Sequence, residues 1–324
     1  MAEITYREAV KQALREEMLR DDRVFLLGED IGEFGGTFKV SLGLLDEFGP
    51  MRVRNTPISE AAIMGLAVGA AATGLRPIAE IMYCDFVPIA MDQLVNQAAK
   101  MRYMYGARLS MPLTVRIPIG GRRSAAAQHS QCLEAWFVHV PGLKVALPSN
   151  AHDAKGLLKW AVRDPNPTLL FENKMLYNTS GEVPDEPYVV PWGQAKIVRH
   201  GTDATVVATS DMVGYSLKAA GALAAEGISV EVIDPRTLVP LDIETIVASV
   251  KRTHRLVIAH EACVTGGIGG EIAARVGYDA FEYLDAPIER VGAKDSPIPF
   301  APVLEEYVLP DDRDVMEAVR RTLS

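Results

Sequence analysis

A helix signal and a strand signal follow each other in residues 59–82, which read SEAAIMGLAVGAAATGLRPIAEIM. No charged residue occurs between Glu60 and Arg76, so a helix over residues 59–73 would be packed on almost all sides. Gly74 is a typical helix stop, and the mostly apolar stretch 77–82 beyond it predicts a buried strand. The stretch therefore predicts a helix–strand unit of an α/β fold, with a single carboxylate at the first turn of the helix.

The same alternation extends along the chain in both directions. In the first part, helices are predicted over residues 5–20, 59–73, 85–103, 133–138 and 151–162, and strands over residues 24–28, 77–82, 113–117, 143–147 and 168–171. Further on, strands near residues 195–198, 204–209, 229–233 and 256–259 alternate with helices near residues 213–226, 243–251 and 269–278. This pattern predicts two doubly wound α/β domains, each with a largely parallel sheet and helices on both faces.

A change of composition marks the boundary between the two domains. Residues 176–192 are rich in Asn, Ser, Gly, Glu and Pro and show no sustained periodicity, which is typical of a linker. We therefore expect a first domain over residues 1–175 and a smaller α/β domain over residues 193–324. The chain has 324 residues and 48% apolar content, enough for two hydrophobic cores.

The charge balance restricts the kind of partner. A net charge of -9 and a pI near 5.3 argue against nucleic acid or an anionic membrane, because both require basic patches, whereas a basic protein module would suit the chain. Cys84, Cys132 and Cys263 have neither disulfide-framework nor zinc spacing, which favours a reducing compartment. The N-terminal residues lack a signal-peptide pattern and the apolar run 61–75 is too short to span a bilayer, so we expect a cytoplasmic protein.

Two residues near residues 59–82 are candidates for ligand binding. Glu60 would be a buried carboxylate, which requires a partner, and none is visible in the surrounding sequence. Phe86 lies where a predicted strand end leads into the next helix, and its ring could form one wall of a site for a planar ligand. Packing in the core is the commoner role for such an aromatic residue.

A second polar segment, residues 120–132, reads GGRRSAAAQHSQC and follows the strand predicted at 113–117. Active sites of doubly wound sheets form at the carboxyl ends of strands, where this segment lies. His129 could exchange a proton near neutral pH or bind a substrate oxyanion. It could equally cap the helix that follows Cys132, and the spacing alone does not separate the two roles.

Two further motifs have both a structural and a functional interpretation. Residues 266–270 read GGIGG before a predicted helix; free backbone N–H groups there could bind an anion, but a turn that lets strand and helix pack closely is the commoner reason. Residues 163–167 read RDPNP and offer several oxygens in a tight loop. They form either a plain helix-to-strand turn or an oxygen-lined site for an alkali cation.

Collinear motifs along the whole chain identify a family. The chain resembles the β subunit of the E1 component of 2-oxo acid dehydrogenase complexes. The motifs that carry the resemblance are residues 28–30 (GED), 55–60 (NTPISE), 74–77 (GLRP), 92–93 (DQ), 126–131 (AAQHSQ), 141–145 (PGLKV), 153–158 (DAKGLL), 284–287 (LDAP) and 309–310 (LP).

The resemblance implies a shared cofactor and two protein partners. In this family thiamine diphosphate is bound between an α and a β subunit, with α holding the diphosphate and Mg²⁺ through a Gly-Asp-Gly motif and β holding the aminopyrimidine. No Gly-Asp-Gly occurs in this sequence, so a separate α subunit is implied, in an α2β2 heterotetramer. Such an E1 cleaves a carbon–carbon bond of its substrate and transfers the acyl group reductively to the lipoyl group of the E2 acyltransferase. The second domain is expected to supply β–β contact and an E2-binding surface.

Individual roles follow from the same resemblance. Glu60 matches the glutamate that hydrogen-bonds the pyrimidine ring nitrogen and so favours the imino form that takes the proton from thiazolium C2. Phe86 matches the aromatic residue beside the pyrimidine, Ile58 belongs to the same cofactor-binding surface, and His129 matches the histidine near the reacting centre. Positions that hold a structural potassium ion in some members match Leu113, Ala161, Val162, Asp164 and Asn166.

The substrate is less sharply indicated. Residues 125–131 are similar to pyruvate and acetoin enzymes, and residues 177–184 look most like the acetoin type. One alternative is the pyrimidine half of a split transketolase-type transferase, which would need more basic residues for sugar phosphates than Arg122 and Arg123. The other is a non-catalytic scaffold subunit, against which the presence of Glu60, Phe86 and His129 together speaks.

Overall fold

The protein, described here for all 324 residues from a computed structural model, separates into two compact units. The first unit comprises residues 1–119 and 136–192, and the second comprises residues 120–135 and 193–324. The polar segment 120–132 thus groups with the second unit, which the sequence analysis did not anticipate. No helix of the chain combines the length and the apolar character needed to cross a membrane.

The first unit is built on a parallel sheet. Its strands run in the spatial order β6-β7-β5-β4-β2-β3. Their bounds are β2 (Val24–Gly28), β3 (Val53–Asn55), β4 (Arg76–Glu80), β5 (Thr114–Ile119), β6 (Lys144–Ala146) and β7 (Thr168–Asn173). All their pairings are parallel, as the alternating pattern predicts.

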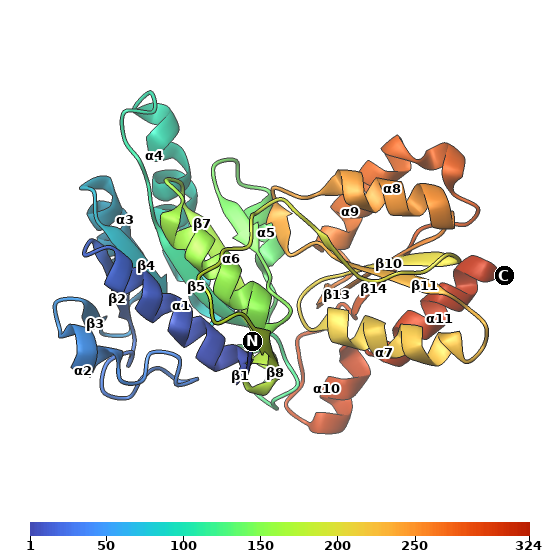
Figure 1. Cartoon of the computed structure of the whole chain (residues 1–324), viewed down its shortest axis with the longest axis horizontal. Coiled ribbons are helices and arrows are strands. Elements are labelled where there is room, and N and C mark those ends of the chain that lie inside the picture. Colours follow the sequence, from blue (N-terminus) through green and yellow to red (C-terminus); the bar gives the residue numbers. More distant parts are fainter. The chain divides into compact units, whose positions relative to one another are not determined.

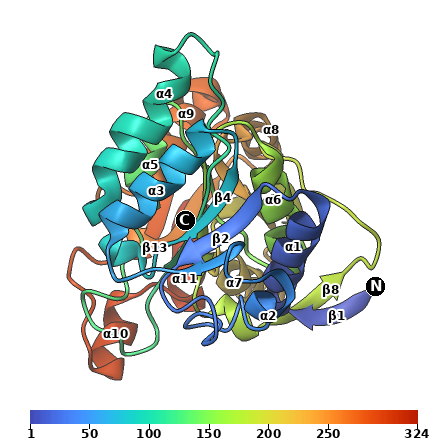
Figure 2. The same ribbon diagram turned by 90° about the vertical axis from the view of Figure 1, so that its left-hand side faces the viewer.

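Helices cover both faces of this sheet. Helices α1 (Tyr6–Arg20) and α6 (Ala151–Arg163) pack together on one side, and α3 (Glu60–Ala72) lies on the other (Figure 2). Helix α1 begins at the cap residue Thr5, whose side chain accepts from the backbone N–H of Glu8, and α6 begins at Asn150 in the same way. The shorter elements of the first unit are α2 (Leu44–Phe48), α5 (Glu134–Val138), at whose start the chain passes from the second unit, and the 3₁₀ turn η3 (Leu176–Asn178).

The helix predicted over residues 85–103 is divided into three parts. A 3₁₀ helix, η1 (Cys84–Ala90), is followed by a π-helical stretch, η2 (Asp92–Ala98), and by the α-helix α4 (Ala99–Met104). Pro88 lies inside η1 and lacks an N–H group, so an uninterrupted α-helix through this position would lose a backbone hydrogen bond. The prediction of one continuous helix was therefore wrong in its type and correct in its position.

The region expected to be a linker contains regular structure. Strand β8 (Ser180–Val183) pairs antiparallel with β1 (Ala2–Thr5) at the start of the chain. A strand of four residues with half-exposed sides carries little sequence signal, because most of its stabilisation comes from a partner far away in the chain.

The second unit contains a smaller, mostly parallel sheet with the order β14-β13-β10-β11-β9. Its strands are β9 (Lys196–Arg199), β10 (Ala204–Ala208), β11 (Val230–Asp234), β13 (Leu256–Cys263) and β14 (Glu289–Ala293), of which β9 is antiparallel to its neighbour. Helices α7 (Met212–Ala224) and α11 (Asp312–Leu323) cover one face, and α8 (Ile243–Thr253) and α9 (Ile268–Asp279) cover the other (Figure 1). The remaining elements are β12 (Thr237–Val239), η4 (Phe281–Tyr283) and α10 (Pro302–Val308).

The glycine cluster before α9 is explained by close packing. A Cβ atom on Gly267 would lie 2.6 Å from the ring of His260, and one on Gly269 would lie 2.8 Å from it. His260 on β13 is fully buried, and burial lowers the pKa of its imidazole to about 4. The glycines thus make room for a neutral, buried histidine, which confirms the close-packing interpretation of residues 266–270.

A buried arginine joins three strands of the first sheet. Arg116 on β5 is 2% exposed and donates from Nε and Nη2 to both oxygens of Glu172 on β7, at 2.9 and 2.6 Å. Its Nη1 donates to Glu80 at the end of β4, at 2.5 Å. Burial would lower the pKa of the guanidinium, but Glu172 and Glu80 together hold the pKa of Arg116 well above its usual value. The guanidinium is therefore charged inside the core, whereas burial raises the pKa of its partner Glu80.

Replacement of Arg116 by Met is expected to destabilise the chain strongly. The variant leaves Glu80 and Glu172 buried without their cation, which costs about 3–5 kcal/mol of unfolding free energy. Urea unfolding of the purified chain measures the loss. The control is Arg15→Met, which removes an exposed ion pair with Glu47 and should change the stability little. Similar losses for the two variants would contradict a special role of the buried network.

Candidate functional site

Three predicted or motif residues lie at the carboxyl edge of the first sheet. Glu29 follows the last residue of β2 directly, Glu60 is the first residue of α3, and Phe86 lies in η1, after the end of β4. The carboxyl ends of parallel strands are where doubly wound folds form their sites. The structure thus places Glu60 and Phe86 at the edge where a ligand is expected.

Glu60 is a buried carboxylate with an open side. Its side chain is 5% exposed, and it makes no hydrogen bond or ion pair with another residue of the chain. It stands in the first turn of α3, where the unpaired N–H groups and the helix dipole favour a negative charge. Ser59 supplies no side-chain cap to α3, and no side chain of the protein donates to the oxygens of Glu60. These oxygens can accept hydrogen bonds from a ligand.

Glu29 is a second buried carboxylate in the same neighbourhood. Its Oε1 atom has no hydrogen-bond partner. Burial raises the pKa of Glu29 to about 7, with further contributions from the nearby charges of Glu60, Asp30 and Glu80. Glu29 therefore binds a proton at neutral pH much more readily than an ordinary glutamate does.

Sequence reasoning placed residues 28–30 in a family motif but assigned Glu29 no role. The signal was its position directly after a buried strand. The strand ends at Gly28 for a steric reason: a Cβ atom there would lie 3.0 Å from the carbonyl oxygen of Glu80. This close approach of β2 and β4 brings the chain after Gly28 toward Glu80.

The apolar candidates beside Glu60 differ in their exposure. Ile58 is 81% exposed, and Phe86 is half-buried. A cavity of 670 Å³ lies beside the loop that carries Ile58; Thr56 and Pro57 of that loop and Leu66 of α3 line part of it. An exposed isoleucine at this edge is available for contact with a ligand or with another chain.

His129 belongs to the second unit and is half-buried. The segment that carries it has an unusual backbone: Arg122, Ser124 and Ala126 have φ angles of 63°, 49° and 60°. Such left-handed conformations are uncommon for residues other than glycine and are found mainly where surrounding contacts enforce them, often at functional sites.

The residues matched to a potassium site lie together in the first unit, but their oxygens already have partners. Arg76 donates to the carbonyl of Val162 at 2.7 Å. The carboxylate of Asp164 pairs with Lys144 at 2.6 Å, and Asn166 Oδ1 accepts from Arg102 at 2.5 Å.

The two remaining carbonyls of this set are also engaged. Leu113 O accepts from the N–H of Thr168 at 2.9 Å, and Ala161 O accepts from the N–H of Asp164 at 3.2 Å. Carbonyl and carboxylate oxygens have more than one lone pair, so these contacts are compatible both with a helix-to-strand turn and with a potassium site.

Replacement of Glu29 by Gln tests the raised pKa. Because the folded-state pKa of about 7 lies above the ordinary value of 4.5, the wild-type chain loses stability, relative to the variant, as the pH rises from about 4.5 to 7. The variant should exceed the wild type by on the order of 1–3 kcal/mol at pH 8 and by much less at pH 5. Urea unfolding at the two pH values measures the difference. An equal difference at both would contradict the raised pKa.

Comparison with protein-family models gives two matches that together cover most of the chain. Residues 2–180 match the transketolase pyrimidine binding domain, and residues 193–315 match the transketolase C-terminal domain. A solved structure described as a split gene transketolase, inactive beta4 tetramer, has a TM-score of 0.82 and 26% sequence identity, and the match covers 99% of this chain and 98% of that one.

Curated relatives are considerably more similar in sequence. The pyruvate dehydrogenase E1 component subunit beta-2, mitochondrial, of Oryza sativa subsp. japonica is 50% identical over 323 residues, which cover 98% of this chain and 86% of the relative. The pyruvate dehydrogenase E1 component subunit beta of Rickettsia felis is 50% identical over 319 residues, or 98% of both chains. With this identity over nearly its full length, and with both transketolase-type domains, the chain belongs to the family of pyruvate dehydrogenase E1 component β subunits.

Proposed function

We propose that this chain is the β half of a thiamine-diphosphate-dependent E1 that cleaves pyruvate and reductively acylates the lipoyl group of an E2 acyltransferase. Support comes from the 50% identity to chains named as pyruvate dehydrogenase E1 β subunits. The observation that carries the mechanism is the Glu60 carboxylate, which is buried at a helix N-terminus and has no partner within the protein.

The residues at this edge of the first sheet fit the pyrimidine side of the cofactor. A nitrogen heterocycle with an amino group presents hydrogen-bond donors and a planar face. Glu60 offers unoccupied acceptor oxygens for the donors. Close to it, the buried Oε1 of Glu29 has no hydrogen-bond partner. Phe86 offers an aromatic surface for the planar face. The oxygen of Glu29 that has no partner can accept a hydrogen bond from such a ligand.

Thiamine diphosphate, when bound, supplies the electron sink that makes decarboxylation of a 2-oxo acid possible. This chain would control the protonation of the pyrimidine ring nitrogen. Glu60 would accept a hydrogen bond from the ring nitrogen, and burial strengthens this bond because water does not compete for it. Ile58 and Phe86 would exclude water from the same surface, and His129 would provide a proton donor or a hydrogen bond at the reacting centre.

The remaining parts of the site are assigned to a second chain. The sequence contains no Gly-Asp-Gly motif for diphosphate and Mg²⁺, so we propose that an α subunit supplies both, in an α2β2 heterotetramer. Residues 1–175 would form the pyrimidine-binding domain, with residues 176–192 as the connection. Residues 193–324 would form the domain for β–β contact and for docking of a basic E2 module, which the net charge of -9 favours.

Replacement of Glu60 by Gln is expected to lower pyruvate turnover at least about 100-fold, because the amide cannot share a proton with the pyrimidine nitrogen. Turnover is measured by dye reduction after assembly with the α subunit and cofactor, and assembly is checked by size-exclusion chromatography. Glu8→Gln, which changes a first-turn carboxylate of α1, serves as the matched control and should retain activity. Near-normal turnover by an assembled Glu60→Gln enzyme would remove Glu60 from the mechanism.

The substrate is tested with the same assembled enzyme. Dye reduction with pyruvate is expected to exceed that with acetoin and with branched 2-oxo acids at least about tenfold in kcat/KM, since the similar curated chains are named for pyruvate. A preference for acetoin would instead support the similarity of residues 177–184 to acetoin enzymes. Binding of the cofactor to no assembly at all would favour a scaffold subunit.

A further inference from the structure

The segment that carries His129 is held in the second unit by side chains distant in sequence. Two of its backbone N–H groups donate to buried carboxylates: Gly121 N to Glu261 Oε1 at 2.6 Å and Ser124 N to Glu305 Oε2 at 3.0 Å. The carboxylates lie on β13 and α10 and are 5% and 3% exposed. Hydrogen bonds from N–H groups to buried charged oxygens are among the stronger neutral–ionic contacts in proteins.

The residue between these two anchors is also fixed. The guanidinium of Arg122 donates to the carbonyl of Pro310, lies 3.8 Å from a carboxylate oxygen of Asp211 and stacks over the ring of Tyr215 at 4.6 Å. Gly121 packs closely against the second unit: a Cβ atom there would lie 2.7 Å from Leu309 Cδ1, and the Leu309 side chain would have to shift. Residues 121–124 are thus seated on the second unit by backbone and side-chain contacts together.

The left-handed residues of the segment explain why such anchoring is needed. Arg122 and Ser124 both have left-handed φ angles. The N–H group of Ser124 donates to Glu305, and Arg122 directly follows Gly121, whose N–H group donates to Glu261. Without the hydrogen bonds from Gly121 and Ser124, the loop would relax out of these conformations. The hydrogen bonds therefore maintain the strained backbone. The conformation is therefore imposed on the segment by β13 and α10.

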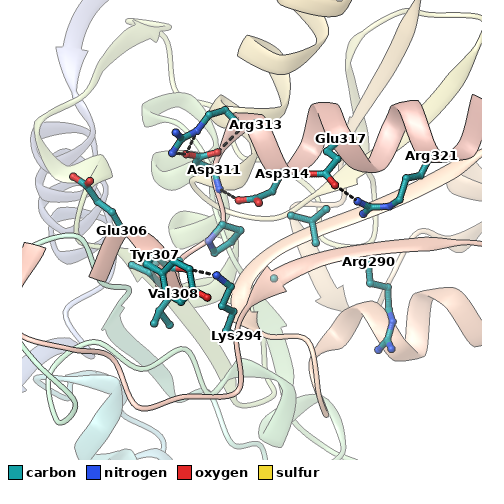
Figure 3. A pocket seen from close by; sticks show the side chains of 14 residues that line it. Arg290, Lys294, Glu306, Tyr307, Val308, Asp311, Arg313, Asp314, Glu317 and Arg321 are labelled. Carbon is teal, nitrogen blue, oxygen red and sulfur yellow. Dashed lines mark hydrogen bonds and ion pairs between the residues drawn. The ribbon is translucent and has the colours of Figure 1, made fainter. Parts of the chain in front are cut away.

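The anchors are themselves held firmly. Helix α10 is tied at its end to the residue after β14: the N–H of Lys294 donates to Val308 O at 3.1 Å, and Lys294 Nζ donates to Tyr307 O at 2.8 Å (Figure 3). Asp311, which follows Pro310, is the N-cap residue of α11 and forms a capping box with Asp314. Glu305 is therefore carried by a rigid support.

Glu261 occupies the centre of a cluster of carboxyl groups. Burial and the charge of Glu261 raise the pKa of Asp211 well above its usual value, although Arg122 opposes this. Burial, with a contribution from Glu261, raises the pKa of Glu134 to about 7. Glu134 lies just beyond the polar segment 120–132, so Glu261 binds the segment near its start and affects the pKa of a carboxyl group after its end.

We propose that Glu261 and Glu305 are positioning residues for His129: by binding the N–H groups of Gly121 and Ser124, they hold the strained segment in the conformation that presents His129 to the reaction. This inference rests on the proposed role of His129. It assigns to the second unit a part in catalysis. Of the residues involved, only His129 would contact substrate or cofactor, and Glu261 and Glu305 would act through it.

The test uses the chain assembled with its α subunit and thiamine diphosphate. Glu305→Met keeps the volume and removes the acceptor, Glu305→Gln keeps an acceptor oxygen, and Glu306→Met changes the exposed neighbour on the same helix as a matched control. Glu305→Met should lower kcat about tenfold with KM for pyruvate nearly unchanged, and should speed amide hydrogen exchange in residues 120–131. Glu305→Gln should restore both properties, and Glu306→Met should alter neither.

A double-mutant cycle separates positioning from a general structural effect. In a His129→Ala background, Glu305→Met should cause less than about a twofold further loss of kcat, because the group that it positions is gone. A full additional tenfold loss would overturn the proposal, as would unchanged hydrogen exchange in residues 120–131 of Glu305→Met.

Two outcomes keep the proposal distinct from the function on which it rests. If His129→Ala alone leaves turnover unchanged, the proposed role of His129 fails, whereas the exchange measurement still decides whether Glu305 holds the segment. If Glu305→Met does not fold, Glu305→Asp replaces it, since its shorter side chain withdraws the carboxylate from the N–H of Ser124. Faster exchange with a lower kcat in Glu305→Asp supports the proposal, and wild-type values of both overturn it.

Discussion

The guanidinium of Arg116 is the contact on which the first unit depends. It joins β4, β5 and β7 by ionic hydrogen bonds in the interior of the sheet, and Glu172 also accepts from the hydroxyl of Tyr177 at 2.7 Å. Burial and the charges of Glu60, Asp30 and Glu80 raise the pKa of Glu29 to about 7, and Arg116, which is paired with Glu80 and Glu172, forms no ion pair with Glu29. The ion pairs of Arg116 and the candidate site thus belong to one cluster of charged groups. The carboxylates of the site are the members of this cluster that have no cation as a partner.

The sequence predicted the architecture well because hydrophobic periodicity records local burial. Both sheets, their parallel strands and most helices follow from it, and Glu60 stands out as a charge in an apolar helix. Where the prediction failed, the cause was not local. Pro88 changed the type of a helix without ending it, and β8 exists only because β1, at the other end of the first unit's sequence, pairs with it.

The candidate site could be predicted in part for the same reason. Glu60 and Phe86 were found from their neighbours in sequence, whereas the significance of Glu29 depends on the absence of a cation in three dimensions. The attachment of residues 120–135 to the second unit could not be predicted from the sequence, since the carboxylates that bind the segment lie 140 and 181 residues further along the chain. Resemblance to a family supplied roles for side chains but not the contacts that hold them.

These long-range anchors also affect the order in which the protein is made. A ribosome delivers the chain from its N-terminus, so the first sheet emerges well before the second unit. Pro310 and Glu305, which bind the His129 segment, follow their partners Arg122 and Ser124 by 188 and 181 residues. During synthesis the segment therefore lacks these contacts until α10 and the residues after it have been made, long after the first sheet is complete.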